Sequence, residues 1–438
     1  MYGLVEALME LLRIPSVAGD GEGCGKALDY IIDKGESFSF ACSKWENGRV
    51  GIIEMGEGEE TLGIFTHVDV SDPGNLNMWQ NPPFDPAVDR GRIIGRGAVD
   101  NKGPALAVLF AMKDVWNMGY QRGIPFKRKI RLIVGTDNES GNTAIKKYLR
   151  ENGEPDYGFT PDGRFPVMNT GNGSMNMVLS FPVRKEKACI RDISTGDERN
   201  TMPGSCRITL MDEKRFEARG RAVLYAYPEQ GSNAIFNMAA ALDSLKGNDR
   251  LALRNDSIFR VMMKLKYGFE DAGGQLAGMP RSSGSYKGEA AGRNIFVPTR
   301  MYVRDDRIFV EMSVSYGGET TEESIVSAME YYFRDADMRI DDIDSSGPFL
   351  TSRNMGFVRI LSDAYEKTVG MKCDYGVSLA PTYAQNSGNL VVFGPALPDS
   401  VYSGHMANEN ISVRDLTTIE SIYEKAIRNM AYREDSLK

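Results

Sequence analysis

The sequence predicts an α/β domain with a mostly parallel central sheet, interrupted by an inserted α+β domain. Before residue 172, apolar strand-like runs alternate with helical segments of roughly 10–17 residues, which is typical of a parallel sheet covered on both faces. Segments of β type become more frequent between 173 and 350, and the earlier pattern returns from 351 to 438. We therefore expect 1–172 and 351–438 to form one domain and 173–350 to form another.

Length and charge narrow the possible functions. A chain of 438 residues corresponds to two or three domains at roughly 150 residues each. Its 52 basic and 60 acidic residues give a net charge of −8, which disfavours nucleic acid and anionic membranes as partners. The five cysteines form no C-x-x-C motif, and no apolar run reaches the roughly 18 residues of a membrane helix. We expect a cytoplasmic protein with reduced thiols.

Periodicity and turn residues predict the individual elements. In the first part we expect a helix ending before residue 15, strands at 50–54, 61–70, 130–136 and 157–159, and helices at 102–118 and 142–150. In the middle part we expect strands at 174–182, 207–211, 219–227 and 309–316, helices at 232–245 and 322–334, and a Gly- and Ser-rich loop at 268–292. The last part predicts helices at 355–369 and 416–430 around a strand at 389–394.

Histidine is scarce, and its placement indicates a site. His67 and His405 are the only two histidines of the chain. His67 ends a buried strand, where ligands collect in open α/β sheets, and the H-x-D spacing places Asp69 on the same strand face. The Asp69 carboxylate would accept from one ring nitrogen and leave the other for a metal ion. Taken alone, the pattern is more often that of a core histidine satisfied by a carboxylate.

Three acidic turns strengthen the metal interpretation. Asp100 directly precedes a long predicted helix, and Glu139 and Asp162 each follow a predicted strand. A single turn of this kind is usually a helix cap or a solvated loop. Three of them at the sheet edge that carries His67 instead predict a common site. Imidazole together with several carboxylates suits zinc first, with manganese or cobalt as alternatives.

The order of motifs resembles the M20 family of metallopeptidases, especially the peptidase V-type dipeptidases. The resemblance rests on the motifs at 66–69, 78–84, 95–104, 137–141, 200–203, 231–234 and 404–409, and so covers nearly the whole chain. It implies a two-zinc catalytic domain interrupted by a lid domain, here 173–350, and a monomer. It also implies a small peptide or N-acyl amino acid as the substrate.

The resemblance assigns a complete set of ligands to two divalent metal ions. His67 and Asp162 would hold one ion, and Glu139 and His405 the other. Asp100 would bridge the two ions. Asp69 falls on the residue that orients the first histidine in the family.

Several positions depart from the family pattern. The general base is expected at Asn138, and an amide cannot accept a proton from water near neutral pH. Loss of such a base commonly costs about 10²–10⁴ in rate. Among the substrate-binding positions of the lid, Asn200 is retained, whereas Leu224 replaces a histidine and Ser315 an arginine. Pro381 and Gln385 similarly stand where a glycine and an arginine are usual.

Neither neighbouring carboxylate is a good alternative base. Using Glu139 would leave the second metal ion short of one ligand, and the ungapped 136–141 stretch gives no reason to shift the alignment. Asp137 is a carboxylate, but we expect its side chain to point to the opposite face from that of Asn138.

Three functions remain open at this point. The chain would be a metal-dependent, dipeptidase-type hydrolase with weak or altered activity. Alternatively, it would be a metal-binding pseudoenzyme that holds a small peptide-like ligand without cleaving it. The third alternative is a structural homologue whose metal ions only stabilise the fold.

Overall fold

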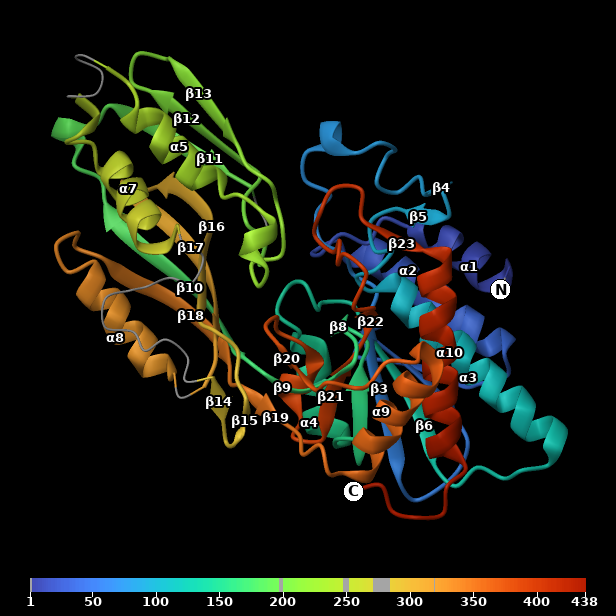
Figure 1. Ribbon diagram of the computed structural model, residues 1–438. Helices are drawn as coiled ribbons and strands as arrows, with labels where there is room; N and C mark the ends of the chain where they lie inside the picture. The colour runs from blue at the N-terminus through green and yellow to red at the C-terminus, as the bar shows by residue number, and fades with distance from the viewer. Residues whose placement is uncertain (1, 197–199, 247–251, 271–283, 319) are drawn as a thin grey trace. The chain divides into compact units, whose positions relative to one another are not determined.

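The computed structural model describes residues 2–196, 200–246, 252–270, 284–318 and 320–438 (Figure 1). The chain divides into two compact units. Unit 1 comprises 1–170, 349–378 and 382–438, and unit 2 comprises 171–348 and 379–381. The predicted boundaries lie two residues from the main divisions of the chain. The predicted loop at 268–292 falls partly on 271–283, outside the described residues.

Unit 1 is built on one large sheet. Its strands occur in the order β1-β2-β6-β3-β7-β21-β9-β19, with β20 paired to β9. Their bounds are β1 Ala41–Trp45, β2 Val50–Met55, β3 Thr61–His67, β6 Lys129–Gly135, β7 Tyr157–Thr160, β9 Val167–Gly171, β19 Phe349–Leu350, β20 Gly376–Ser378 and β21 Leu390–Phe393. The central strands β6, β3, β7 and β21 are parallel, which confirms the predicted fold class. The carboxyl ends of these four strands therefore lie at one edge of the sheet.

Helices cover both faces of this sheet because its strands are apolar on both sides. Ile64 packs into a large core with α1 Tyr2–Leu12, α2 Gly21–Ser37, α3 Lys102–Arg122, α9 Gly356–Val369 and α10 Val413–Ala431. The next residue, Phe65, packs on the other face with α4 Thr143–Asn152 and the 3₁₀ turn η4 Tyr383–Asn386. This alternation is the two-residue period of a strand, and it explains why the sequence reads as continuous apolar runs.

Small sheets and turns complete unit 1. They are β4 Ala87–Asp89, β5 Arg92–Ile94 and β23 Asn410–Ser412 in one sheet, β8 Gly163–Arg164 with β22 Pro395–Ala396 in another, and the 3₁₀ turn η1 Leu76–Met78. The antiparallel pairing of β23 with β5 joins the C-terminal part of the chain to the loop that leads to Asp100.

Unit 2 is an antiparallel sheet with helices on one face. The strand order is β13-β12-β11-β16-β17-β10-β18. The strand bounds are β10 Gly173–Pro182, β11 Ile190–Thr195, β12 Ser205–Leu210, β13 Arg215–Arg219, β16 Ile295–Arg304, β17 Arg307–Tyr316 and β18 Arg339–Ser346. The helices are α5 Ala234–Asp243, α7 Ser257–Phe269 and α8 Glu322–Tyr332. Short elements are β14 Ser285–Tyr286, β15 Glu289–Ala290, η2 Lys185–Lys187 and η3 Pro228–Gln230.

The predicted strand at 219–227 is wrong. Strand β13 ends at Arg219, and the following residues form a loop held by two isolated bridges, Arg221 to Ser232 and Thr201 to Leu224. The apolar residues 223–226 are buried in this loop, so their hydrophobicity reflects burial and not strand pairing. Likewise, β3 ends at His67 and does not extend to Val70.

Candidate metal centre

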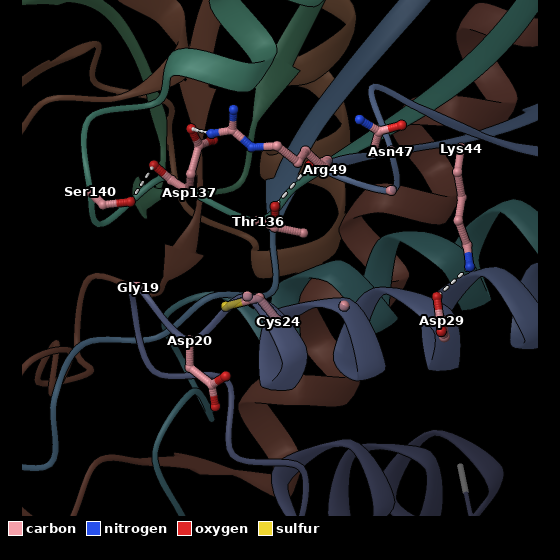
Figure 2. Close-up of a pocket in the computed structure, with 13 residues that line it drawn as sticks. Gly19, Asp20, Cys24, Asp29, Lys44, Asn47, Arg49, Thr136, Asp137 and Ser140 are labelled. Atoms are coloured by element: carbon pink, nitrogen blue, oxygen red, sulfur yellow. Dashed lines mark hydrogen bonds and ion pairs between the residues drawn. The ribbon is translucent and has the colours of Figure 1, made fainter.

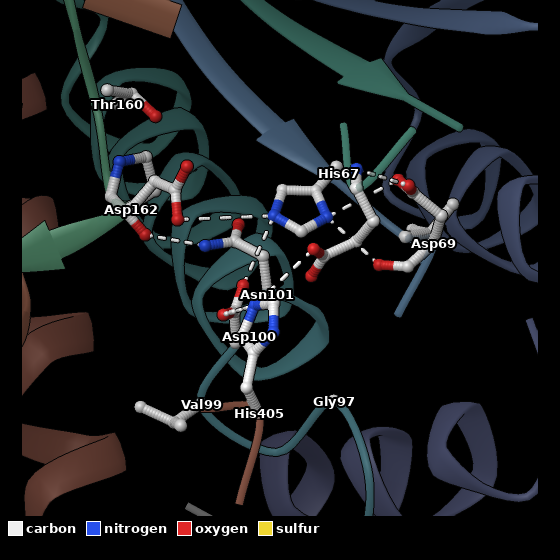
Figure 3. Close-up of polar contacts among 12 residues, drawn as sticks. His67, Asp69, Gly97, Val99, Asp100, Asn101, Thr160, Asp162 and His405 are labelled. Carbon is white, nitrogen blue, oxygen red and sulfur yellow. Dashed lines mark hydrogen bonds and ion pairs between the residues drawn. The ribbon is translucent and has the colours of Figure 1, made fainter. Parts of the chain in front are cut away.

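Five side chains of unit 1 converge at the carboxyl edge of its sheet. His67 Nε2 lies 3.3 Å from Asp100 Oδ1 and 4.0 Å from Asp162 Oδ1. His405 Nε2 lies 3.5 Å from Asp100 Oδ2 and 3.3 Å from Glu139 Oε2. Figure 3 shows Asp100 among the two histidines and Asp162. The two oxygens of Asp100 thus face different histidines, which is the arrangement expected of a bridging carboxylate.

Each of these residues is brought to the edge by a different element. His67 ends β3, Asp162 follows β7, and Glu139 lies in the turn between β6 and α4. Asp100 precedes α3, and His405 lies in the loop before β23 with a left-handed backbone φ of 62°. The common edge of the parallel strands thus places three of the five residues, and the loops that carry Asp100 and His405 bring the other two to it.

The orientation of His67 leaves one ring nitrogen available. Its Nδ1 lies 2.9 Å from the main-chain carbonyl of Asp69, so Nδ1–H donates there. Nε2 is buried and completes no hydrogen bond among the described residues. A buried nitrogen lone pair without a partner is costly, and a cation would satisfy it. The geometry and the donor set therefore fit a metal ion.

Asp69 acts differently from the expectation. Its main-chain carbonyl, and not its carboxylate, accepts from His67, since Oδ1 lies 3.4 Å from Nδ1 and completes no hydrogen bond. The other carboxylate oxygen, Oδ2, accepts from the backbone N–H of Glu139 at 2.9 Å. The strand ends at His67, so the two-residue period no longer governs residue 69. Asp69 consequently fixes His67 and the turn of Glu139 together.

Charges within the cluster are unevenly distributed. Burial opposes the ionised form of Asp100, but His67 and His405 outweigh it and hold the pKa of Asp100 below its ordinary value. Burial, with the nearby Asp100 and Glu139 carboxylates, raises the pKa of Asp162. Burial works against protonation of His67, yet the neighbouring carboxylates of Asp100, Asp69 and Asp162 raise its pKa well above 6.5. So many acidic groups in a buried space are compatible only when cations or protons balance them.

A buried carboxylate fixes the loop that carries Asp100. Glu409 Oε1 accepts from the backbone N–H of Val99 at 2.9 Å and of Asp100 at 3.0 Å. Its Oε2 accepts from Gly97 N–H at 3.1 Å and pairs with Arg96 Nη1 at 2.9 Å. Burial and Asp100 raise the pKa of Glu409, while Arg96 opposes this shift. The sequence interpretation recognised the motif containing Glu409 but gave it no role.

Two further links hold the site, and sequence reasoning missed both. The Tyr402 hydroxyl donates to Asp100 Oδ2 at 2.7 Å, and Asn101 Nδ2 donates to the carbonyl of Pro161 at 2.7 Å. The second bond ties the Asp100 loop to the turn that carries Asp162. Neither residue carries a spacing signal, because each acts through a partner distant in the chain.

Asn138 precedes Glu139 in the turn and is half-buried. Its side chain acts on Tyr383, whose ring centroid lies 6.4 Å from that of His67. Burial and Asp69 raise the pKa of Tyr383 well above 10, and the Asn138 amide acts in the opposite direction. The hydroxyl nevertheless completes no hydrogen bond among the described residues. A β-carbon at Gly135 would lie 2.6 Å from this hydroxyl, so glycine is required for this approach.

Asp137 is occupied elsewhere. Its Oδ2 accepts from Arg49 Nη2 at 2.7 Å and from the backbone N–H groups of Thr143 at 2.9 Å and Ala144 at 3.0 Å. It thereby caps α4 and lines a different hollow of about 690 Å³ with Arg49 and Ser140 (Figure 2). With a fourth bond from the Thr143 hydroxyl at 2.6 Å, these contacts hold the carboxylate at the start of α4, so Asp137 is a poor substitute base.

The three predicted substrate-binding positions lie on unit 2. Ser315 is buried, donates to the carbonyl of Leu379 at 2.6 Å and accepts from Asn172 Nδ2 at 2.8 Å. Its hydroxyl is therefore used within unit 2. Leu224 is buried and offers no polar group. Asn200 has a φ of 61°, and its Oδ1 lies 3.5 Å from Ser313 Oγ.

Comparisons with known proteins identify the family of the chain and agree with its fold. Residues 63–429 match the model of peptidase family M20/M25/M40, and the chain belongs to this family. The Bacillus subtilis (strain 168) protein named "Putative dipeptidase YtjP" is 27% identical, with 98% of this chain and 97% of that protein covered. A Staphylococcus epidermidis protein named "Putative dipeptidase" is 26% identical over 97% of this chain and 96% of its own length.

Solved structures share the fold at low sequence identity. Human carnosine dipeptidase 1 superposes with a TM-score of 0.60 at 12% identity, covering 98% of this chain and 96% of that one. An M20 family metallo-carboxypeptidase from Sulfolobus solfataricus superposes with a TM-score of 0.60 at 16% identity, covering 98% of this chain and 99% of that one.

None of the helices among the described residues has both the length and the hydropathy of a membrane span.

Proposed function

We propose that this protein is a metal-dependent hydrolase of dipeptidase type whose peptide-cleaving activity is weak or altered. The observation that carries the proposal is the cluster around Asp100, with the unpartnered Nε2 of His67 directed into it. His67 and Asp162 would hold one divalent ion, Glu139 and His405 the other, and Asp100 would bridge them. Zinc suits this donor set first, with manganese or cobalt as alternatives.

The chemistry would divide between the ions and the side chains. A pair of bound cations lowers the pKa of water and polarises a carbonyl oxygen. Asp69 keeps His67 in the tautomer that presents Nε2 and holds the turn of Glu139. Asn138 can orient a water molecule through its amide but cannot remove its proton. The proposed reaction therefore lacks its usual proton acceptor and is expected to be slow by about 10²–10⁴.

The proposed substrate is a small peptide or an N-acyl amino acid, bound by a monomer. The names of the two relatives, which both begin with "Putative dipeptidase", support this class. The alternative is a pseudoenzyme that binds such a ligand without cleaving it. It is favoured by Asn138 together with Leu224, since both polar groups expected for catalysis are absent from these positions.

A matched pair of variants tests the proposal. Wild-type chain, Asn138→Glu and Asn138→Gln are assayed on a dipeptide panel with zinc, manganese or cobalt, after bound metal has been counted by elemental analysis. We expect Asn138→Glu to be about 10²–10⁴ faster than Asn138→Gln, because the carboxylate can accept a proton and the amide of the same size cannot. An active wild type that Asn138→Glu does not accelerate would contradict the base assignment. Activity confined to Asn138→Glu would favour the pseudoenzyme. If the protein binds no stoichiometric metal, both the hydrolase and the metal-binding pseudoenzyme are ruled out.

A further inference from the structure

The two oxygens of the Asp100 carboxylate have unequal surroundings. Oδ1 faces His67 Nε2 at 3.3 Å. Oδ2 faces His405 Nε2 at 3.5 Å and in addition accepts a hydrogen bond from the Tyr402 hydroxyl at 2.7 Å. Oδ2, on the side of the bridge that would serve the Glu139–His405 ion, thus accepts from a hydroxyl donor. No matching hydrogen bond to Oδ1, on the His67 side, is identified among the described residues.

The approach of Tyr402 to Asp100 is built into the loop. Tyr402 is only 6% exposed. A β-carbon on Gly404 would lie 2.7 Å from the Tyr402 ring and 2.8 Å from Asp100 Oδ2, so only glycine permits this packing. Ser403 holds the loop from the other side, since its Oγ donates to the carbonyl of Asn410 at 3.0 Å and accepts from Asn410 N–H at 3.0 Å.

The backbone of Asp100 is held independently. Its N–H donates to Glu409 Oε1 at 3.0 Å, so the peptide before the side chain is fixed by one buried group and the carboxylate by another. A carboxylate with a fixed backbone can still rotate about its side-chain bonds. The Tyr402 hydrogen bond removes that freedom at the oxygen that faces His405.

We propose that Tyr402 is a positioning residue that holds the Asp100 bridge for the metal ion at Glu139 and His405. This inference rests on the proposed metal centre. A carboxylate oxygen has more than one acceptor direction, so the phenol can occupy one and leave another for a cation. Hydrogen bonds to an ionised carboxylate are short and strong, and partners of this kind commonly contribute 10- to 100-fold to metal affinity.

The test compares Tyr402→Phe with Tyr423→Phe in the full chain. Tyr423 is a suitable control because it is also buried in unit 1, and its hydroxyl donates to the carbonyl of Phe393 at 3.1 Å, away from the proposed ligands. Metal-stripped protein is titrated with cobalt, with binding followed by calorimetry and by the visible absorption of the bound ion. Glu139→Gln identifies the binding step that belongs to the Glu139–His405 ion.

We expect Tyr402→Phe to weaken that step by about 10- to 100-fold and to change the other step little. Tyr423→Phe should leave both steps unchanged. In the Glu139→Gln background, Tyr402→Phe should have no further effect on the remaining step. A merely structural role of Tyr402 would instead weaken both steps together.

Three results separate this inference from the proposed function. If wild type binds two ions and Tyr402→Phe binds both equally well, Tyr402 does not position the bridge, and the metal centre stands. If Tyr402→Phe weakens both steps to the same extent, the assignment to one half of the site is overturned. If wild type binds no cobalt and no zinc, the proposed function fails, and this inference falls with it.

Discussion

Units 1 and 2 treat their polar residues in opposite ways. In unit 1, ligand-type side chains converge, and His67 Nε2 is left without a hydrogen-bond partner. In unit 2, the hydroxyl of Ser315 is already bonded to Leu379 and Asn172, and Leu224 offers only hydrocarbon. A buried group without a partner is costly and is retained where a ligand would complete it. The comparison shows that unit 1 keeps all the proposed metal ligands, whereas unit 2 has lost two of the side chains expected to contact the substrate.

The largest expected difference concerns buried charge. Glu409→Gln should lower the free energy of unfolding of unit 1 by about 3–5 kcal/mol, because Arg96 would remain buried without its counter-charge. Glu229→Gln removes a half-exposed ion pair with Arg293 in unit 2 and should cost less than about 1 kcal/mol. Urea unfolding followed by tryptophan fluorescence reports on unit 1, which contains all three tryptophans, Trp45, Trp79 and Trp116. Hydrogen exchange measures the free energy of unfolding of both units. Equal losses of that free energy in Glu409→Gln and Glu229→Gln would contradict the expected difference.

Metal addition should stabilise only one region. At a free concentration of 100 times Kd, zinc should raise the free energy of unfolding of unit 1 by about 2.7 kcal/mol. Hydrogen exchange read by mass spectrometry should show protection in peptides that contain His67, Asp100, Glu139 and His405. Equal protection in the strands of unit 2 would count against the metal centre. So would the absence of protection when zinc is added back to chelator-treated protein.

Ser315→Ala tests whether the hydroxyl serves unit 2 alone. Loss of its bonds should destabilise unit 2 by about 1–3 kcal/mol, since the Leu379 carbonyl loses its donor. Exchange in peptides covering 379–381 should increase, while metal stoichiometry stays unchanged. The control is Ser313→Ala on the same strand, whose hydroxyl bonds the Asn176 side chain at 2.8 Å and not the 379–381 segment. A change in metal affinity for Ser315→Ala would contradict the separation of the two regions.

The smallest expected effect concerns the ionisation of two buried thiols, and it should be the same in both units. Burial raises the pKa of Cys24 in unit 1 and of Cys206 in unit 2 from 9.0 to about 12. Below pH 9 both thiols are neutral in the folded and unfolded chain; above it the unfolded thiols ionise first, so stability falls as the pH rises toward 12. Both should therefore react with iodoacetamide at pH 8 more slowly in the native chain than in urea, as peptide mapping can measure. Fast native labelling of one of them would show that its site opens.

Much of unit 1 was predictable because its strands and helices have local signals. The helix expected at 355–369 is observed as α9 Gly356–Val369, and the strand expected at 130–136 as β6 Lys129–Gly135. The error at 219–227 arose because an apolar stretch buried in a loop has the same composition as a strand. Periodicity reports burial, and burial alone does not fix the backbone conformation.

The candidate site was predictable only in its direct ligands. The two histidines and the acidic turns are marked by residue type and by their position after strands. Glu409, Tyr402 and Asn101 were missed as contributors because each acts by a hydrogen bond to a partner far away in the chain. Asp69 was recognised, but the atom through which it acts was not, because the strand ends three residues earlier than expected.

The amino-acid order alone established the family, the α/β class and the residue types suited to holding divalent cations, since these depend on local pattern and on motif order. The folded chain decided which nitrogen of His67 is left open, which oxygen of Asp100 faces which histidine, and that Ser315 is already satisfied. Such choices depend on distances between segments that are remote in the chain. Packing fixes those distances to fractions of an ångström, and no local pattern encodes them.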